Sequence, residues 1–187
     1  MNLITAELIK NYFGAPESNE DEWELIDRVF QSRASYTVIE LMDDPSISAD
    51  DKMHIIFHYA DIRDADLYEF ACWCIEQVIS IWEAERPSDI TPQLGIEAVR
   101  MWLRNEVSED EVHDVDYSPN QVAKGASRNA KAIASSVAEM LNLWGGDYAA
   151  KLATNIIDED HFPGAEQRHL DKLREIVLNQ PLTTQGA

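Results

Sequence analysis

The clearest hydrophobic pattern of the chain lies between Leu67 and Asn105, where apolar residues recur at steps of three and four. In the first half, the positions that share one side of a helix are Leu67, Phe70, Ala71, Cys74, Val78, Ile81 and Trp82. Pro87 predicts the end of this helix, because proline lacks a backbone donor and restricts the residue before it. In the second half, the apolar positions are Leu94, Ile96, Ala98, Val99, Trp102 and Leu103. The pattern predicts two antiparallel helices that pack through Trp82 and Trp102.

The turn between these two helices has signals of its own. Thr91 suits an N-cap, and Pro92 is tolerated at the first helical position. Asp89 can close the turn through an Asx hydrogen bond. Glu97 and Arg100 lie three residues apart on the second helix, so we expect them to pair on its surface.

The rest of the chain shows helical spacing in shorter stretches. It predicts helices near residues 3–9, 23–30, 53–60, 121–144, 148–157 and 170–177. The run YTVIEL at 36–41 has some strand character, but no second strand is evident to pair with it, so we interpret it as helix. Ser48 and Ser108 are placed to cap helices. The prediction is an all-α, single-domain multi-helix bundle of packed helical hairpins over 1–187, with 181–187 a frayed tail.

Charge narrows the choice of partner. The 187 residues are 45% hydrophobic, enough for one domain with a substantial core. Thirty-five acidic residues stand against fifteen Lys and Arg, which gives a net charge of −20 and a sequence pI near 4.4. Such a surface repels nucleic acid and anionic membranes and attracts basic proteins. An ordinary acidic protein with no basic partner would have the same composition.

The most acidic segment follows the second helix of the pair. Its carboxylates are Glu106, Glu109, Asp110, Glu111, Asp114 and Asp116. The large apolar residues among them are three valines, so most of the segment must face water. It is the candidate partner-binding surface, although a solvated segment that binds no partner would have the same sequence pattern.

The cysteines indicate a reducing compartment, and the N-terminal residues show no pattern typical of a secretion signal. Cys72 and Cys74 are two positions apart on a helix and point about 200° from each other, so they cannot form a disulfide. The first residues lack a basic region followed by an apolar run. No stretch approaches the roughly 20 apolar residues that a membrane span needs. We therefore expect a cytoplasmic protein.

Candidate chemistry is sparse. His54 and His58 are four apart on a predicted helix and could bind a metal, but HExxH is absent and no third ligand is fixed by spacing. Two surface histidines beside Asp61 and Asp64 are the preferred interpretation, and no metal or cofactor is predicted. The chain has no glycine-rich phosphate loop, no GxSxG elbow and no cysteine–histidine signature. We expect no catalytic residues and a protein that acts by binding.

Residues 74–102 carry an ordered set of motifs. They are a Cys-x-Glu-x-Val start, an aromatic followed by Glu, a Pro-x-Asp-x-x-Pro turn and Ile-Glu-Ala-x-Arg-x-Trp, at Cys74, Glu76, Val78, Trp82, Glu83, Pro87, Asp89, Pro92, Ile96, Glu97, Ala98, Arg100 and Trp102. This order resembles the immunity protein family of bacterial toxin–immunity (polymorphic toxin) systems. Its motif residues include Glu83, Asp89, Glu97, Arg100 and Trp102. The resemblance implies an antitoxin that binds one cognate toxin and covers its active site or substrate channel.

Two other functions stay open on the sequence alone. The first is a phage-type nucleic-acid mimic, whose carboxylates copy phosphate spacing and inhibit a CRISPR, restriction or other nucleic-acid-binding enzyme. The second is a helical adaptor or scaffold. Trp73 could anchor a contact if it is exposed, although burial against another helix is favoured. The identity of the partner separates these functions, because an immunity protein should recognise one toxin.

Overall fold

The computed structural model describes residues 3–13, 20–115, 124–143, 145–156 and 162–179, and these ranges are mostly helical. The chain divides into two compact units, Met1–Ile62 with Glu166–Ala187, and Arg63–Ala165. The all-α class expected from the sequence is confirmed, since a two-stranded ladder is the only sheet within the described ranges. The expected organisation as one domain over 1–187 stays a prediction. The expected tail at 181–187 lies outside the described residues.

The first unit contains a β ladder that the sequence did not predict. Strands β1 (Ile4–Thr5) and β2 (Ser35–Tyr36) pair antiparallel, with Ile4 opposite Tyr36. Both side chains are only 1% exposed, so the ladder belongs to the core. The helical interpretation of Ile4 and Tyr36 was therefore wrong. Two-residue strands about thirty residues apart are too short to show the alternation that identifies a strand.

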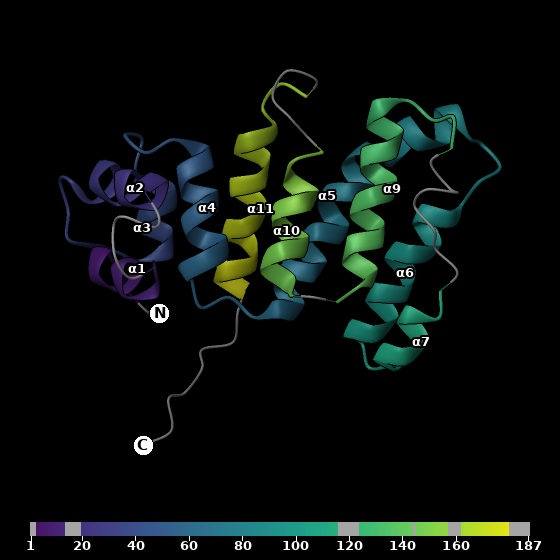
Figure 1. Ribbon diagram of the computed structural model, residues 1–187, viewed down its shortest axis with the longest axis horizontal. Coiled ribbons are helices and arrows are strands. Elements are labelled where there is room, and N and C mark those ends of the chain that lie inside the picture. The colour runs from purple at the N-terminus through teal and green to yellow at the C-terminus, as the bar shows by residue number, and fades with distance from the viewer. Residues whose placement is uncertain (1–2, 14–19, 116–123, 144, 157–161, 180–187) are drawn as a thin grey trace. The chain divides into compact units, whose positions relative to one another are not determined.

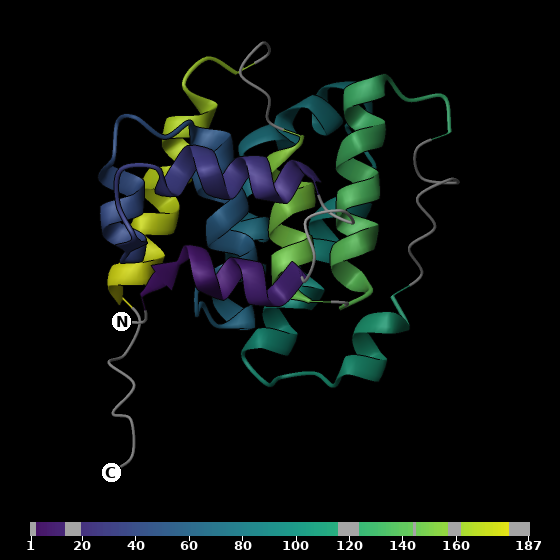
Figure 2. The same ribbon diagram turned by 60° about the vertical axis from the view of Figure 1, so that its left-hand side comes forward.

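Five helices complete the described part of this unit. They are α1 (Ala6–Phe13), α2 (Glu20–Phe30), α3 (Val38–Asp43), α4 (Ala49–Tyr59) and most of α11 (Ala165–Asn179). Helices α1 and α2 lie side by side (Figure 2). Ser48 caps α4 as expected, accepting a hydrogen bond of 3.1 Å from the Asp51 backbone N–H. The Asp51 carboxylate in turn accepts two hydrogen bonds, of 2.9 and 2.7 Å, from Arg28, which ties α2 to α4.

The second unit is arranged around one long helix, α5. Its described helices are α5 (Asp64–Glu85), α6 (Thr91–Leu103), α7 (Glu109–His113), α9 (Arg128–Leu141) and α10 (Gly146–Thr154). In Figure 1, α10 and α9 lie beside α5, and α6 lies beside α9. The fully buried residues of α5 are Phe70, Ala71, Cys72, Cys74, Ile75, Val78 and Trp82, which cover more than one of its faces. This is the burial expected of a helix with neighbours on several sides.

The helix predicted over 121–144 is shorter than expected. Its described part, α9, begins at Arg128, because Ser127 adopts an extended backbone and its hydroxyl accepts the Ala130 N–H at 3.2 Å. Helix α9 ends at Leu141, and Gly145 then precedes the first residue of α10 with a φ of 145°. Residues 121 and 144 lie outside the described ranges.

Two glycines set the distance between helices in the second unit. A Cβ added to Gly95 of α6 would lie 2.4 Å from Cγ1 of Val137 on α9. A Cβ on Gly146 would lie 2.6 Å from the carbonyl oxygen of Asp64 and 2.8 Å from Cβ of Leu67. Carbon atoms normally approach to about 3.5–4.0 Å. At both positions the neighbouring helix therefore comes closer than any larger residue allows.

Candidate functional site

The turn between α5 and α6 is closed by Asp89. Its Oδ1 accepts hydrogen bonds from the Thr91 backbone N–H at 3.1 Å and from the Thr91 hydroxyl at 2.5 Å. The Asx bond expected from the sequence is confirmed. Thr91 is the first residue of α6 and not its N-cap, which is Ile90, so the predicted cap was wrong by one position. Asp89 satisfies the N-terminal donor that an Ile side chain cannot.

Two tryptophans hold the hairpin at its opposite ends. Trp82 is fully buried, and its indole Nε1 donates a hydrogen bond of 2.8 Å to the Asp89 carbonyl oxygen. Trp102 of α6 packs edge-on against Tyr68 of α5, with ring centroids 5.3 Å apart and an interplanar angle of 86°. Tyr68 and Trp82 are separated by about 21 Å along α5 at 1.5 Å per residue. The expected contact between α5 and α6 is confirmed for Trp102, whereas Trp82 binds the turn between the two helices.

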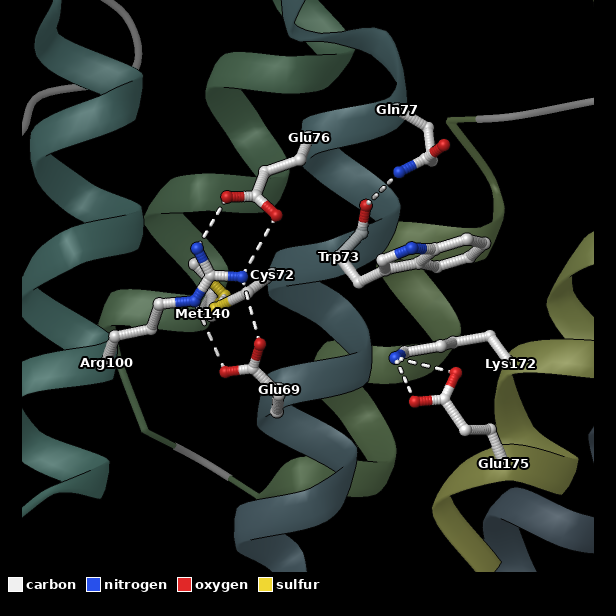
Figure 3. Close-up of polar contacts among 9 residues, drawn as sticks. All are labelled: Glu69, Cys72, Trp73, Glu76, Gln77, Arg100, Met140, Lys172 and Glu175. Atoms are coloured by element: carbon white, nitrogen blue, oxygen red, sulfur yellow. Dashed lines mark hydrogen bonds and ion pairs between the residues drawn. The ribbon is translucent and has the colours of Figure 1, made fainter.

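Arg100 bridges the two helices between two glutamates of α5 (Figure 3). Its Nε and Nη2 bind the Glu69 carboxylate at 3.2 and 2.9 Å. Nη2 also binds Glu76 at 2.9 Å, and Nη1 makes a second contact to the same carboxylate. These hydrogen bonds, first those to Glu76, raise the pKa of Arg100 above its usual value. The expected pairing of Arg100 with Glu97 was wrong, because the guanidinium points across to α5 and not along α6.

The other two charged motif residues also contact neighbouring helical segments. Glu83 of α5 accepts a hydrogen bond of 3.1 Å from Gln93 of α6. Glu97 pairs with Arg104 at 2.9 Å, and Arg104 binds Glu106 through two nitrogens at 2.8 and 3.0 Å. This contact lowers the pKa of Glu106. All five motif residues named from the sequence therefore take part in the structure of the hairpin and its exit.

A further polar contact fixes the start of α9 to the end of α5. The Glu85 carboxylate accepts hydrogen bonds from the Ser127 backbone N–H, at 3.0 Å, and from the Ser127 hydroxyl. Those bonds lower the pKa of Glu85. Arg86 donates to the carbonyl oxygen of Lys124 beside it. No local sequence pattern predicts this contact, because its partners are about forty residues apart.

The two cysteine thiols of α5 are buried and free. Both cysteines are free, as expected from their spacing. The Cys72 thiol donates to the Met140 sulfur at 3.5 Å (Figure 3), and burial raises its pKa to about 12. Burial also raises the pKa of Cys74 well above its usual value. Near neutral pH both remain thiols, which are poor nucleophiles and poor metal ligands.

The acidic segment after α6 contains two kinds of carboxylate. Committed carboxylates bind a donor within the described part of the chain, and uncommitted carboxylates form no ion pair there. Helix α7 has Val112 as its fully buried residue and begins with a capping box. Glu111 accepts the Ser108 N–H at 2.8 Å, while the Ser108 hydroxyl accepts the Glu111 N–H at 3.3 Å. The pKa of Glu111 is lowered by these bonds. Glu106 and Glu111 thus have partners within the chain.

Three acids of this segment stay available for an outside partner. Glu109, Asp110 and Asp114 are exposed and form no ion pair within the described part of the chain. Asp116, the last of the six predicted contact residues, lies outside the described ranges. The structure therefore brings Glu109, Asp110 and Asp114 together on one short helix and its C-cap.

The remaining candidate residues contribute other contacts. His54 and His58 lie with ring centroids 4.7 Å apart on α4 of the first unit. In the described residues, no group of three or more His, Cys, Asp and Glu side chains could hold a metal ion. Trp73 is half-buried and stacks on Phe70 with centroids 6.0 Å apart. The backbone carbonyl of Trp73 accepts the Gln77 side-chain amide at 3.3 Å (Figure 3).

These observations define a helical protein whose motif residues hold its own scaffold and whose uncommitted acids face water. Residues 58–153 match the model of a family described as Imm-5 like putative immunity protein. Because this match covers more than half of the 187 residues, the chain belongs to that family, and the resemblance found in the motifs is confirmed. Comparisons with curated proteins and with solved structures give no match. Within the described residues, no helix has both the length and the apolar character to cross a membrane.

Proposed function

We propose that this chain is an immunity protein that binds one cognate toxin in the cytoplasm and blocks it by direct contact, without chemistry of its own. The observation that carries the proposal is the family match over residues 58–153. This region includes the α5–α6 hairpin and helix α7. The family relation therefore covers both the scaffold and its acidic surface.

The charges of the second unit favour a basic partner. Residues 63–115 contain thirteen Asp and Glu against four Arg. Arg100 and Arg104 are each bound to two glutamates of the chain, so they offer little positive charge to a partner. A negative surface of this kind speeds association with a positively charged protein and makes it sensitive to salt. A toxin that acts on nucleic acid has a basic substrate groove and fits this description.

The contacts within the hairpin support inhibition by a preformed surface. Asp89 and Trp82 fix the turn, and Arg100 fixes the middle of the pair. A surface held in place before binding loses less conformational entropy when the complex forms. Covering a toxin's active site needs only such a surface.

In toxin–immunity loci the two genes lie together, so the proposal is tested on the product of the gene adjacent to the one that encodes this chain. This product is expressed in a bacterial host with and without the chain. We expect the wild-type chain to restore growth and the purified pair to form a complex. Toxicity that the chain does not relieve, together with no complex, would refute the proposal. Inhibition of several unrelated nucleic-acid enzymes by the chain would instead identify a nucleic-acid mimic.

The role of the uncommitted acids is tested by neutralising Glu109, Asp110 and Asp114 together, as Gln, Asn and Asn. We expect the association rate with the adjacent gene product to fall about tenfold at low salt, because electrostatic steering is weakened. The control neutralises three exposed acids of the first unit, Glu7, Glu24 and Asp27. Equal association rates for the two triple variants would exclude α7 as the steering surface.

A further inference from the structure

The outer face of α6 exposes large apolar side chains. Ile90 is 57% exposed and Leu94, one turn later, is 55% exposed. Met101 lies two further turns along the same face and is half-buried. The neighbouring side of the helix carries Gly95 and Val99, which are buried. The sequence placed Leu94 on the buried side of the helix, and this was wrong.

The fold itself does not require these apolar side chains. Helix α6 contacts α9 at Gly95, where the helices approach too closely for a side chain. Arg100 and Gln93 face α5, where they bind glutamates. Ile90 and Leu94 leave more than half of their surface in water. Apolar anchors of this kind, within a polar rim, are typical of the centre of a protein interface.

Two glutamates lie toward the C-terminal part of this apolar face. Glu97 follows Leu94 by one turn, is exposed and lies on the same side of α6. The exit of the helix continues into the acidic segment at Glu106, which Arg104 links to Glu97. A surface that is apolar at its centre and negative at its edge complements an apolar side chain flanked by Lys and Arg. It repels a nucleic acid, which offers phosphates in place of the apolar group.

We propose that Ile90 and Leu94 form the apolar anchor of the toxin contact, with Met101 extending it along α6. The occupant is an apolar side chain on a basic face of the toxin, and Glu97 and Glu106 form the acidic edge of the contact. This inference rests on the proposed immunity function and locates the centre of its contact surface. Rim charges then govern the rate of association, whereas the anchor governs the rate of dissociation.

The test measures binding of the purified full-length chain to the purified product of the adjacent gene by surface plasmon resonance. We expect Ile90→Ala and Leu94→Ala each to weaken the complex about five- to tenfold, since each removes about half a buried apolar side chain from the interface. The loss should appear in the dissociation rate. The matched control is Leu178→Ala, because Leu178 is 60% exposed on α11 of the first unit and should leave binding unchanged.

The outcomes separate this inference from the proposed function. A wild-type chain that neither binds nor protects refutes the proposed function, and the anchor with it. A wild-type chain that binds, with both alanine variants and Leu178→Ala equal to it, refutes the anchor alone. Thermal unfolding of each variant checks that the fold is retained, which their exposure leads us to expect. Hydrogen exchange of the complex should show protection of backbone amides over residues 90–101, and its absence there would also contradict the anchor.

Discussion

The close approach of α6 and α9 predicts that alanine at Gly95 lowers stability. In a helix, replacing glycine by alanine normally raises the free energy of unfolding by about 1 kcal/mol. Here the new Cβ would lie 2.4 Å from Cγ1 of Val137, about 1 Å inside a normal carbon contact. Relieving such overpacking costs about 1–3 kcal/mol. We therefore expect Gly95→Ala to lower the free energy of unfolding by about 1 kcal/mol.

A second substitution should reverse the sign of this effect. Val137→Ala removes the methyl group that the new Cβ would meet, and alone it should cost about 2 kcal/mol because two buried methyl groups are lost. In that background the Cβ at position 95 fills space and does not clash. Gly95→Ala should then raise the free energy of unfolding by about 1 kcal/mol. The two substitutions should therefore show a coupling of about 2 kcal/mol.

The assay is urea unfolding of the wild type, both single variants and the double variant, followed by tryptophan fluorescence and circular dichroism. The slope of each unfolding curve reports whether the exposed surface changed as well. If Gly95→Ala stabilises the wild type by about as much as it stabilises the Val137→Ala chain, the two helices do not approach as closely as described. Additive effects would contradict the argument in the same way.

Three further predictions concern polar contacts. Arg100→Gln should lower the free energy of unfolding by about 1–2 kcal/mol at low salt and by less at 1 M salt, because the two carboxylates it binds are partly exposed. Urea unfolding at two ionic strengths measures this, and equal losses would exclude a charge effect. Asp89→Ala should cost about 1 kcal/mol in thermal unfolding, whereas Asp89→Asn should retain most of the stability because its amide oxygen still accepts the same bonds. Hydrogen bonds from Thr37 and then from Arg33 lower the pKa of Glu40 from 4.5 to about 2. Its contribution should be full above pH 4.5 and disappear as the pH falls toward 2, so Glu40→Gln should reduce the loss of stability over that range.

Local signals explain which parts of the fold could be predicted from the sequence. The helical spacing of apolar residues in α5 predicts a buried helix, and it does so without knowledge of the helices that pack against it. The helix and its end before Pro87 could therefore be predicted from spacing alone. The Asx bond of Asp89 joins residues two apart, and it was predictable for the same reason. The caps by Ser48 and Ser108 also depend on a few adjacent residues.

Long-range contacts account for what the sequence could not specify. Arg100 binds Glu69 and Glu76, which are 31 and 24 residues away, although Glu97 lies closer in the sequence. With 35 acids in the chain, spacing alone gives no means of choosing among them. The exposure of Leu94 has a similar origin. Its spacing fits an apolar stripe, but Gly95 turns the neighbouring side of the helix toward α9.

The construction of α7 has a consequence for how this protein can change over generations. The helix depends on the capping box at Ser108 and on the burial of Val112, while Glu109, Asp110 and Asp114 contribute nothing to its packing. Substitutions at such positions usually alter the free energy of unfolding by about 0.5 kcal/mol or less. As the surface of a partner evolves, these three acidic residues can therefore be substituted one at a time. Each step leaves the scaffold intact, so new specificities can arise without a compensating substitution in the core.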